Sequence, residues 1–348
     1  MARPTTPVSD PAPGPVPAPD PRPARTRRRP VWLALRLLVT AGLCAWIVAV
    51  VDWRAFWGLV RASDPWILAL VVVMRLAGTG ISAYKWQRLL RIHGHDHPLG
   101  RLTRWYLAAT FLSHLLPTSI GGDAYRIYKT MDGRGPRSNA VVAVLSERLT
   151  GIVALVLMGL VAAVYLVVDA RHPVAVVFLV VGGGATMAGA IALGLAVRLR
   201  LAERLTRARR LPRIVRSLGA PLTDLRAHPG ELARALLISF LFHLNRIAVI
   251  WLILVALGTT TDYVALVVAS ATVEVVGVLP ITLGGFGLVE GSFIFVMGQF
   301  GVGTETALAG MLLMRVLLLP WILLGAVFYF MGDRGPSGPR QGWEQTIR

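Results

Sequence analysis

The feature that most constrains this chain is a series of apolar stretches, each long enough to cross a lipid bilayer. A hydrocarbon layer of about 30 Å is crossed by roughly 20 helical residues, and several such stretches occur between Val31 and Met331. Lipid offers no hydrogen-bond partner to bare backbone, so each stretch should be an α-helix. Charged residues make up only 16% of the chain and hydrophobic residues 55%. The sequence therefore predicts an all-α polytopic membrane protein and excludes a water-soluble one.

The net charge of +18 comes almost wholly from arginine, since Lys85 and Lys129 are the only lysines. The arginines gather in particular segments between the apolar stretches, which is typical of the positive-inside rule and not of nucleic-acid binding. We therefore expect a bacterial inner (cell) membrane protein with both termini in the cytoplasm. Cys44 is the only cysteine, which excludes an internal disulfide and a cysteine-based metal cluster. No metal and no cofactor is expected.

Composition divides the chain into a membrane domain and two tails. Residues 1–30 carry ten prolines and end in a basic cluster, so they are predicted to be a disordered cytoplasmic tail. Residues 31–331 form the predicted transmembrane domain. Within it, the stretch 198–231 holds nine arginines and is predicted to be a basic cytoplasmic loop, too short for a catalytic domain. Residues 332–348 form the second cytoplasmic tail.

The order of apolar and basic segments predicts six spans and two re-entrant hairpins. Residues 105–120 lie between two basic segments, so a full crossing there would break the charge rule, whereas a hairpin that dips in from the cytoplasm obeys it. A second hairpin, formed by residues 263–279 and 286–300, would open to the outside. The two hairpins would form an inverted repeat. The predicted spans are residues 31–51, 66–86, 139–168, 173–197, 232–257 and 305–330.

Both predicted hairpins carry the motif L-P-x-x-x-G-G, at residues 116–122 and 279–285. Proline removes a backbone donor and paired glycines tolerate unusual dihedrals, so each motif should end one helix and start another. The new helix N-termini attract anions, and paired breaks of this kind mark the substrate site of many transporters. A chance match is the alternative, because Leu-Pro also occurs at Leu211 and Leu319. The predicted tip residues are Pro117, Gly121, Gly122, Pro280, Gly284 and Gly285.

Ionisable residues occur inside the apolar stretches, where a central Asp, Lys or Arg costs about 2.5–3.5 kcal/mol on insertion scales. One arginine precedes and one follows each hairpin, and the guanidinium fork suits a phosphate group. The acidic residues are expected to neutralise these arginines or to relay protons. The alternative is that each is half of a buried ion pair or reaches the interface. The predicted phosphate-binding residues are Arg75, Arg148, Arg246 and Arg315, and the predicted charge partners are Asp123, Glu147, Glu274 and Glu290.

The histidines offer two further candidates. His114 and His243 lie in apolar context, and we expect them to be packed or hydrogen-bonded rather than catalytic. The segment 93–97 holds three histidines and one aspartate, which resembles a metal cluster. Its flanking Gly94 and Pro98 and the basic residues around it favour a solvated loop instead.

Four stretches resemble the flippase-like membrane region of lysylphosphatidylglycerol synthases and their stand-alone relatives: LLPTSIGGDAYRIYKT (115–130), SERLTG (146–151), LPITLGGFGLVEGSF (279–293) and MLLMR (311–315). The resemblance runs from about Val31 to Met331. It implies a membrane domain that moves or handles anionic or aminoacylated phospholipids, or polyprenyl-phosphate-linked sugars. It does not bring lysine transfer with it, since the soluble aminoacyl-transferase domain of the full synthases has no counterpart in this sequence. The residues that it singles out are Gly121, Gly122, Asp123, Glu147, Arg148, Gly284, Gly285, Gly287 and Glu290.

Three functions fit these observations. A lipid translocase would admit a headgroup phosphate between the hairpins and alternate its access, with Glu147, Arg148 and Arg315 at the phosphate and proton-coupling core. An intramembrane glycosyl- or phospho-transferase is disfavoured because the sequence has no D-x-D, phospho-alcohol transferase or acid-phosphatase motif, so no enzyme is expected. An accessory subunit would dock a cytoplasmic synthase through residues 198–226, although that basic loop also suits anionic lipid heads. A membrane phospholipid is the expected partner, nucleic acid is not, and an oligomer is compatible with the sequence.

Overall fold

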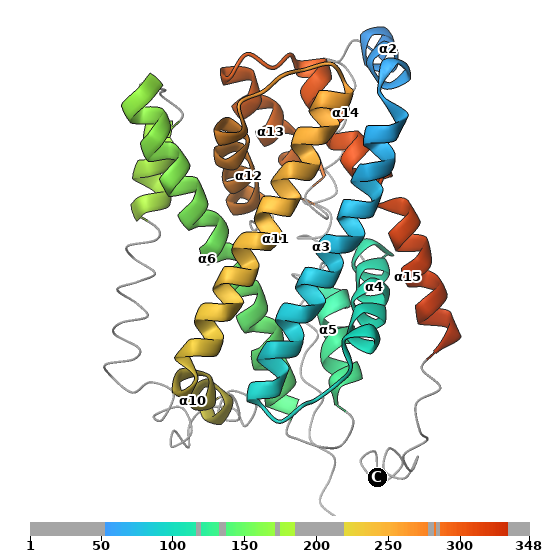
Figure 1. The fold of residues 1–348 in the computed structure, drawn as a ribbon, viewed down its shortest axis with the longest axis vertical. Helices are drawn as coiled ribbons and strands as arrows, with labels where there is room; N and C mark the ends of the chain where they lie inside the picture. Colours follow the sequence, from blue (N-terminus) through green and yellow to red (C-terminus); the bar gives the residue numbers. More distant parts are fainter. Residues whose placement is uncertain are drawn as a thin grey trace, which may run out of the picture.

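The computed structural model describes residues 53–115, 120–131, 137–170, 175–184, 219–277, 282 and 286–332. All regular secondary structure in these residues is helical (Figure 1), which confirms the predicted all-α class for this part of the chain. The labelled helices are α2 (Trp53–Ala62), α3 (Pro65–Ile92), α4 (Leu99–Leu115), α5 (Ile120–Thr130), α6 (Arg137–Ala170), α10 (Gly219–Ala227), α11 (Pro229–Ala256), α12 (Tyr263–Gly277), α13 (Leu288–Gln299), α14 (Thr304–Val316) and α15 (Leu319–Met331).

Four of the described helical segments are long and apolar enough to cross a membrane: Pro65–Ile92, Ser138–Val168, Pro229–Ala256 and Thr304–Met331. They match four of the predicted spans. The predicted span 31–51, both tails and most of residues 173–218 lie outside the described residues, apart from the short helix Ala175–Gly184. The chain is therefore a multi-pass membrane protein, and the number of six spans stays a prediction.

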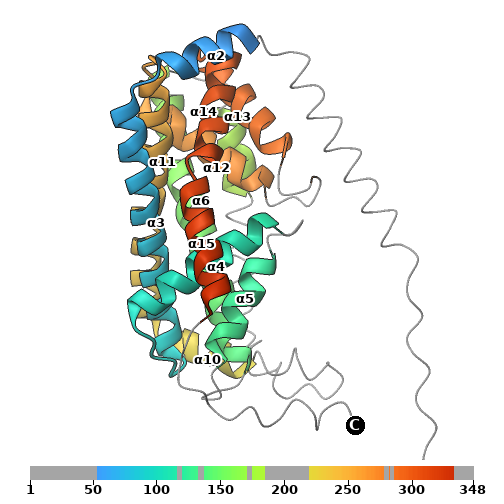
Figure 2. The same cartoon turned by 90° about the vertical axis from the view of Figure 1, so that its right-hand side faces the viewer.

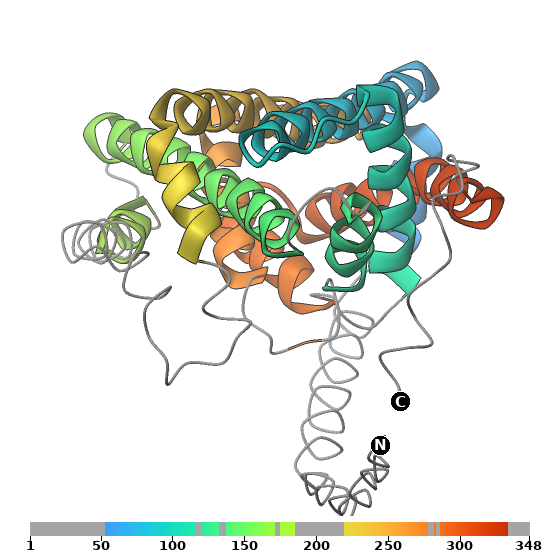
Figure 3. The ribbon, with the colours of Figure 1, turned by 90° about the horizontal axis from the view of Figure 1, so that it is seen from below.

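Helix α3 begins where the sequence supplies a cap. The Asp64 carboxylate accepts the Trp66 N–H at 2.8 Å, and Pro65 occupies the first position of α3. The two helices α3 and α11 lie side by side and run in opposite directions (Figures 1 and 3). A Cβ added to Gly78 would lie 2.9 Å from Asn245 Oδ1, so glycine permits this close approach. We call the two ends of the molecule the α2 end and the α10 end.

Two pairs of shorter helices approach each other from opposite ends. The end of α4 and the start of α5 face the end of α12 and the start of α13 (Figure 2), and each pair packs together. The first pair is longer than expected: α4 begins at Leu99 and α5 runs to Thr130. Arg126 and Lys129, predicted to lie in a cytoplasmic loop, are therefore helical.

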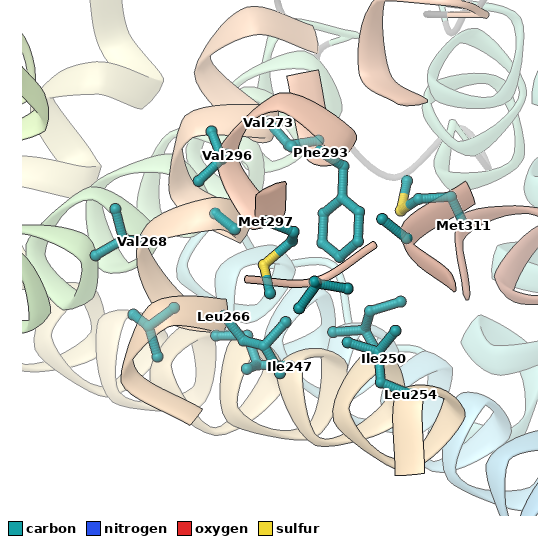
Figure 4. Close-up of a cluster of buried hydrophobic side chains, with 14 of the residues drawn as sticks. Ile247, Ile250, Leu254, Leu266, Val268, Val273, Phe293, Val296, Met297 and Met311 are labelled. Carbon is teal, nitrogen blue, oxygen red and sulfur yellow. The ribbon is translucent and has the colours of Figure 1, made fainter. Parts of the chain in front are cut away.

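The apolar side chains form two separate clusters. The larger joins α11, α12, α13 and α14, with Leu254, Leu266 and Met297 fully buried (Figure 4). The smaller lies toward the α10 end and contains Trp86 and Leu102. Because lipid tails are as apolar as these side chains, the clusters stabilise the fold within the bilayer by close van der Waals packing and not by removal of apolar surface from water.

The last span is broken in the middle. Helix α14 ends at Val316 and α15 begins at Leu319. The Leu318 N–H donates to the Arg315 carbonyl oxygen at 3.2 Å, three residues back, and Pro320 has no N–H to donate. The continuous helix predicted for residues 305–330 is therefore two helices. The two pieces have different neighbours, since α14 packs on α11 and α13 whereas α15 packs on α4.

Candidate functional site

Several ionisable side chains of the spans lie between the two apolar clusters. On α11, His243 and Arg246 come after Ala235 of the smaller cluster and before Ile247 of the larger one. The same order holds on α6, where Glu147 and Arg148 follow the smaller cluster and precede the larger. We call this zone the polar layer. Its members are Arg75, Lys85, Tyr106, Asp123, Arg126, Glu147, Arg148, Ser239, His243, Arg246 and Glu274.

Glu147, with 5% of its surface exposed, is the centre of one network in the polar layer. Its carboxylate forms an ion pair with Arg126 and accepts a hydrogen bond from the Tyr106 hydroxyl at 3.3 Å. Lys85 Nζ donates to the Glu147 backbone carbonyl oxygen at 2.9 Å and to Ser239 Oγ at 3.0 Å. The network therefore joins α3, α4, α5, α6 and α11 at one point.

Sequence reasoning missed Lys85, Tyr106, Arg126 and Ser239 as members of this network. The Arg126 guanidinium lies 4.3 Å from the Trp86 ring centroid and 4.5 Å from that of Tyr106, which favours a buried cation. One available signal was the spacing of Asp123 and Arg126, which places them on the same face of a helix. The positive-inside rule instead assigned Arg126 to a loop.

An ion pair joins each short-helix pair to the span that follows it, and the two partners are the same number of residues apart in both cases. Asp123 of α5 pairs with Arg148 of α6 at 2.5 Å. Glu290 of α13 accepts a hydrogen bond from Arg315 Nε of α14 at 2.6 Å. Each arginine follows its acidic partner by 25 residues. The two halves of the chain thus place an acidic residue in the first turn of a short helix and its arginine on the span that follows.

The tip glycines do not all act as helix breaks. Gly121 and Gly122 lie inside α5, and a Cβ on Gly122 would lie 2.4 Å from the Ala109 carbonyl oxygen. One helix ends and another begins at this motif, as expected, since α4 ends at Leu115 and α5 begins at Ile120. Gly122 itself is helical, and its lack of a side chain lets α5 approach α4. Pro117, Pro280, Gly284 and Gly285 lie outside the described residues.

Gly287, by contrast, has a backbone that favours glycine. Its φ of 78° lies in the left-handed region. Its N–H donates to Glu290 Oε2 at 2.8 Å. The protein's own carboxylate therefore caps the start of α13, where the sequence suggested a free anion site.

The remaining ion pair of the polar layer joins Arg246 of α11 to Glu274 of α12 at 2.6 Å. Arg75 of α3 interacts electrostatically with Arg246. Its buried Nε atom has no hydrogen-bond partner, and no described carboxylate forms an ion pair with it. Arg148 also interacts electrostatically with Glu274. Glu274 thus interacts with both Arg246 and Arg148, whereas the charged neighbour of Arg75 is the like-charged Arg246.

Arg315, the fourth predicted arginine, lies with Glu290 on α14 and α13. Its guanidinium stacks 4.0 Å above the Phe286 ring centroid. No described contact joins this pair to the polar layer. Binding of a phosphate by the four arginines stays a prediction.

The histidines differ in part from expectation. His243 Nε2 lies 2.9 Å from the Gly151 carbonyl oxygen, as expected for a hydrogen-bonded side chain. His93, His95 and His97 are buried rather than solvated, which corrects the predicted solvated loop. The segment folds inward because Gln87 Nε2 donates to the His97 carbonyl oxygen at 2.7 Å. Within the described ranges, no group of three or more His, Cys, Asp or Glu residues is arranged to hold a metal ion.

Comparison with known proteins gives one match. The family model described as the lysylphosphatidylglycerol synthase TM region matches residues 33–326, which include every residue of the polar layer and the Glu290–Arg315 pair. No curated protein matches the chain.

Proposed function

The chain belongs to the lysylphosphatidylglycerol synthase membrane-region family, and from this premise we propose that it moves an anionic or aminoacylated phospholipid, or a polyprenyl-phosphate-linked lipid, between the two leaflets. Its integral membrane fold suits this role because the acyl chains can stay in lipid while the headgroup crosses through the polar layer. The proposal is transport and not chemistry on the lipid.

Arg75 carries the proposal. It lies ten residues after the first residue of α3, so it sits about 15 Å along the helix and near the middle of a hydrocarbon layer of about 30 Å. A cation at this depth is costly unless an anion or water accompanies it. The neighbouring Arg246 is already held by Glu274. A headgroup phosphate that contacts Arg75 and shares Arg246 with Glu274 would satisfy both guanidinium groups.

The path that we propose runs between two re-entrant hairpins, α4–α5 and α12–α13. Two observations support this arrangement. The helix pairs approach each other from opposite ends of the molecule (Figure 2), and their acidic first turns bind arginines at the same spacing. In an inverted repeat, rocking of one half against the other exposes a central site to each side in turn.

The described charges support an orientation with the α10 end in the cytoplasm of a bacterial cell. Basic residues are concentrated at that end, whereas Arg54 and Arg61 lie at the α2 end. Positive charge marks the cytoplasmic side of membrane proteins. The basic residues at the α10 end include Arg88, Arg91, Arg101, Arg104, Lys129, Arg226 and Arg234.

The test is a flipping assay on the purified protein in liposomes that contain a fluorescent anionic phospholipid. We expect the intact chain to accelerate flipping, and Arg75→Ala and Arg148→Ala to abolish the acceleration. Arg91→Ala is the matched control, because Arg91 is an exposed arginine of the same helix as Arg75 and pairs only with Asp96 among the described carboxylates. Wild-type flipping by Arg75→Ala would overturn the assignment of the site. Lipid product without flipping would favour the transferase alternative.

A further inference from the structure

Helix α2 is fixed at the level where α3 leaves the bilayer. Only Ser63 and Asp64 separate the two helices. The Asp64 N–H donates to the Ala256 carbonyl oxygen at the end of α11, and Ser63 Oγ donates to the Val60 carbonyl oxygen at 2.7 Å. Figure 2 shows α2 lying across the ends of the long helices rather than along them. Helix α2 is therefore held across the end of the molecule at which α3 begins.

The three faces of α2 have different surroundings. Phe56 is buried, and Leu59 and Val60 pack against the larger apolar cluster. Trp53 and Trp57, one helical turn apart, lie beside this anchor with 36% and 53% of their surfaces exposed. The Phe56 ring packs edge-on against both indoles.

The third face is basic. Arg54 and Arg61 are two turns apart, so they share a side of the helix. Both are exposed and lie on the side away from Phe56. A shallow groove lined by Trp53, Arg54, Trp57, Gly58, Val60 and Arg61 runs along the helix. Tryptophan is the side chain that membrane interfaces favour, and arginine binds phosphate with its planar fork.

We infer that α2 is an interfacial helix whose Arg54 and Arg61 bind the headgroups of anionic phospholipids in the leaflet at the α2 end. Trp53 and Trp57 lie at the boundary between the headgroups and the acyl chains. The packing of Phe56 holds this surface on the protein, so the lipid surface is the occupant that the charge and the level of the helix both fit. This inference does not depend on the proposed transport.

Depth-dependent quenching tests the position of the helix. Gly58 is exposed and a Cβ there meets nothing within 4 Å, so Gly58→Cys in a Cys44→Ser background can carry a fluorophore. The protein is placed in phosphatidylcholine vesicles with nitroxide either near the headgroup or at the chain end. We expect the Gly58 label to be quenched more by the shallow nitroxide than by the deep one.

Two further labels calibrate this measurement. Thr260→Cys, in the connection between α11 and α12, is an exposed loop position at the same end. Val153→Cys, exposed at the middle of α6, is a deep position. The inference is overturned if neither nitroxide quenches the Gly58 label, which would place α2 in water, or if the label follows the Val153 label, which would place α2 in the hydrocarbon.

The lipid specificity is tested with the same Gly58 label. Headgroup-labelled phosphatidylglycerol should quench it at least roughly fivefold more efficiently than headgroup-labelled phosphatidylcholine, because each arginine near an anionic surface favours anionic lipid by about that factor. The Arg54→Ala/Arg61→Ala variant should remove this difference and keep the shallow depth. Equal quenching by both lipids in the wild type, or a difference that persists in the variant, would overturn the assigned headgroup contact.

Discussion

The Glu290 carboxylate binds Arg315 through one oxygen and caps helix α13 through the other. Oε1 accepts Arg315 Nε at 2.6 Å, and Oε2 accepts the Gly287 N–H at 2.8 Å. Because both oxygens are engaged and the residue is buried, the carboxylate has little freedom to rotate. It fixes the start of α13 relative to α14, as Asp123 fixes α5 relative to Arg148 of α6.

Loss of this carboxylate should destabilise the protein strongly. Glu290→Ala leaves the Arg315 guanidinium without its partner and the Gly287 N–H without an acceptor, and removing one member of a buried pair costs about 3–5 kcal/mol. We expect a large fall in the melting temperature in detergent. Asp96→Ala is the control, because the Arg91–Asp96 pair is exposed and such pairs contribute about 0–1 kcal/mol. Equal melting temperatures for both variants would contradict the structural role of Glu290.

Arg126 and Glu147 should be energetically coupled. Arg126→Ala leaves a buried carboxylate, and Glu147→Gln leaves a buried guanidinium, so each single change should be costly. The double variant has neither charge of this pair, so it leaves no unpaired charge at this contact. The coupling free energy between the two changes should be about 1–3 kcal/mol. Denaturation of the four proteins of the cycle in detergent measures it. Additive effects would show that Arg126 does not hold α5 on α6.

Gly325 should not tolerate a side chain. A Cβ there would lie 2.2 Å from the Leu107 carbonyl oxygen, which is backbone and cannot move aside. Gly325→Ala should therefore separate α15 from α4 and cost about 1–3 kcal/mol. Gly291→Ala is the matched control: it is also a helical glycine, a Cβ there meets nothing within 4 Å, and alanine gains about 1 kcal/mol of helix propensity. The two melting temperatures should move in opposite directions.

His93 should make folding sensitive to mild acid. Burial lowers the pKa of His93 below its ordinary value of 6.5, against the attraction of Asp224, while His95 and His228 also disfavour its charge. Below about pH 6.5 the unfolded chain then binds a proton that the folded chain does not bind, so the free energy of unfolding falls as the pH drops. Between about pH 7.5 and 5.5, the melting temperature of His93→Gln should fall less than that of the wild type. An equal fall in melting temperature for His93→Gln and the wild type over this pH range would contradict the role of His93.

Labelling of two cysteines can test whether α4 and α5 form a re-entrant hairpin. Gly100 lies at the start of α4 and Tyr128 near the end of α5, and both are exposed. In a Cys44→Ser background, cysteines at both positions should react with an impermeant maleimide from the same side of the membrane. Reaction from opposite sides would make the pair a full crossing and remove the inverted repeat.

The sequence predicted most of the long helices because their signal is local. Apolar length and flanking charge placed the spans within a few residues, as for 139–168 against Arg137–Ala170. Arg148, Arg246 and Arg315 form ion pairs because an unpaired charge in hydrocarbon is costly. From the sequence, such buried pairs were the alternative to phosphate binding. Which acidic residue binds which arginine depends on helix packing and could not be derived from composition.

Three features needed tertiary information. The charge rule assigned Arg126 to a loop, and its place in α5 depends on packing against Glu147. The histidines of segment 93–97 were predicted to be solvated, and their burial depends on the hydrogen bond from Gln87 to the His97 carbonyl oxygen. Helix α2 lies between the predicted spans 31–51 and 66–86, where the sequence predicted no helix. Its amphipathic pattern was available in the sequence, but the level at which it lies is set by the turn at Asp64.

The break at Leu317 and Leu318 divides one span into two helices that pack on different partners. Helix α14 packs on α13, and α15 packs on α4, where Gly325 lets the backbones approach closely. If the two short-helix pairs shift relative to each other, the chain must flex at this break, where the Leu318 N–H has already left the regular α-helical pattern. Arg315 lies two residues before Leu317. The break therefore lies next to the ion pair between Glu290 and Arg315, which joins α13 to the last turn of α14.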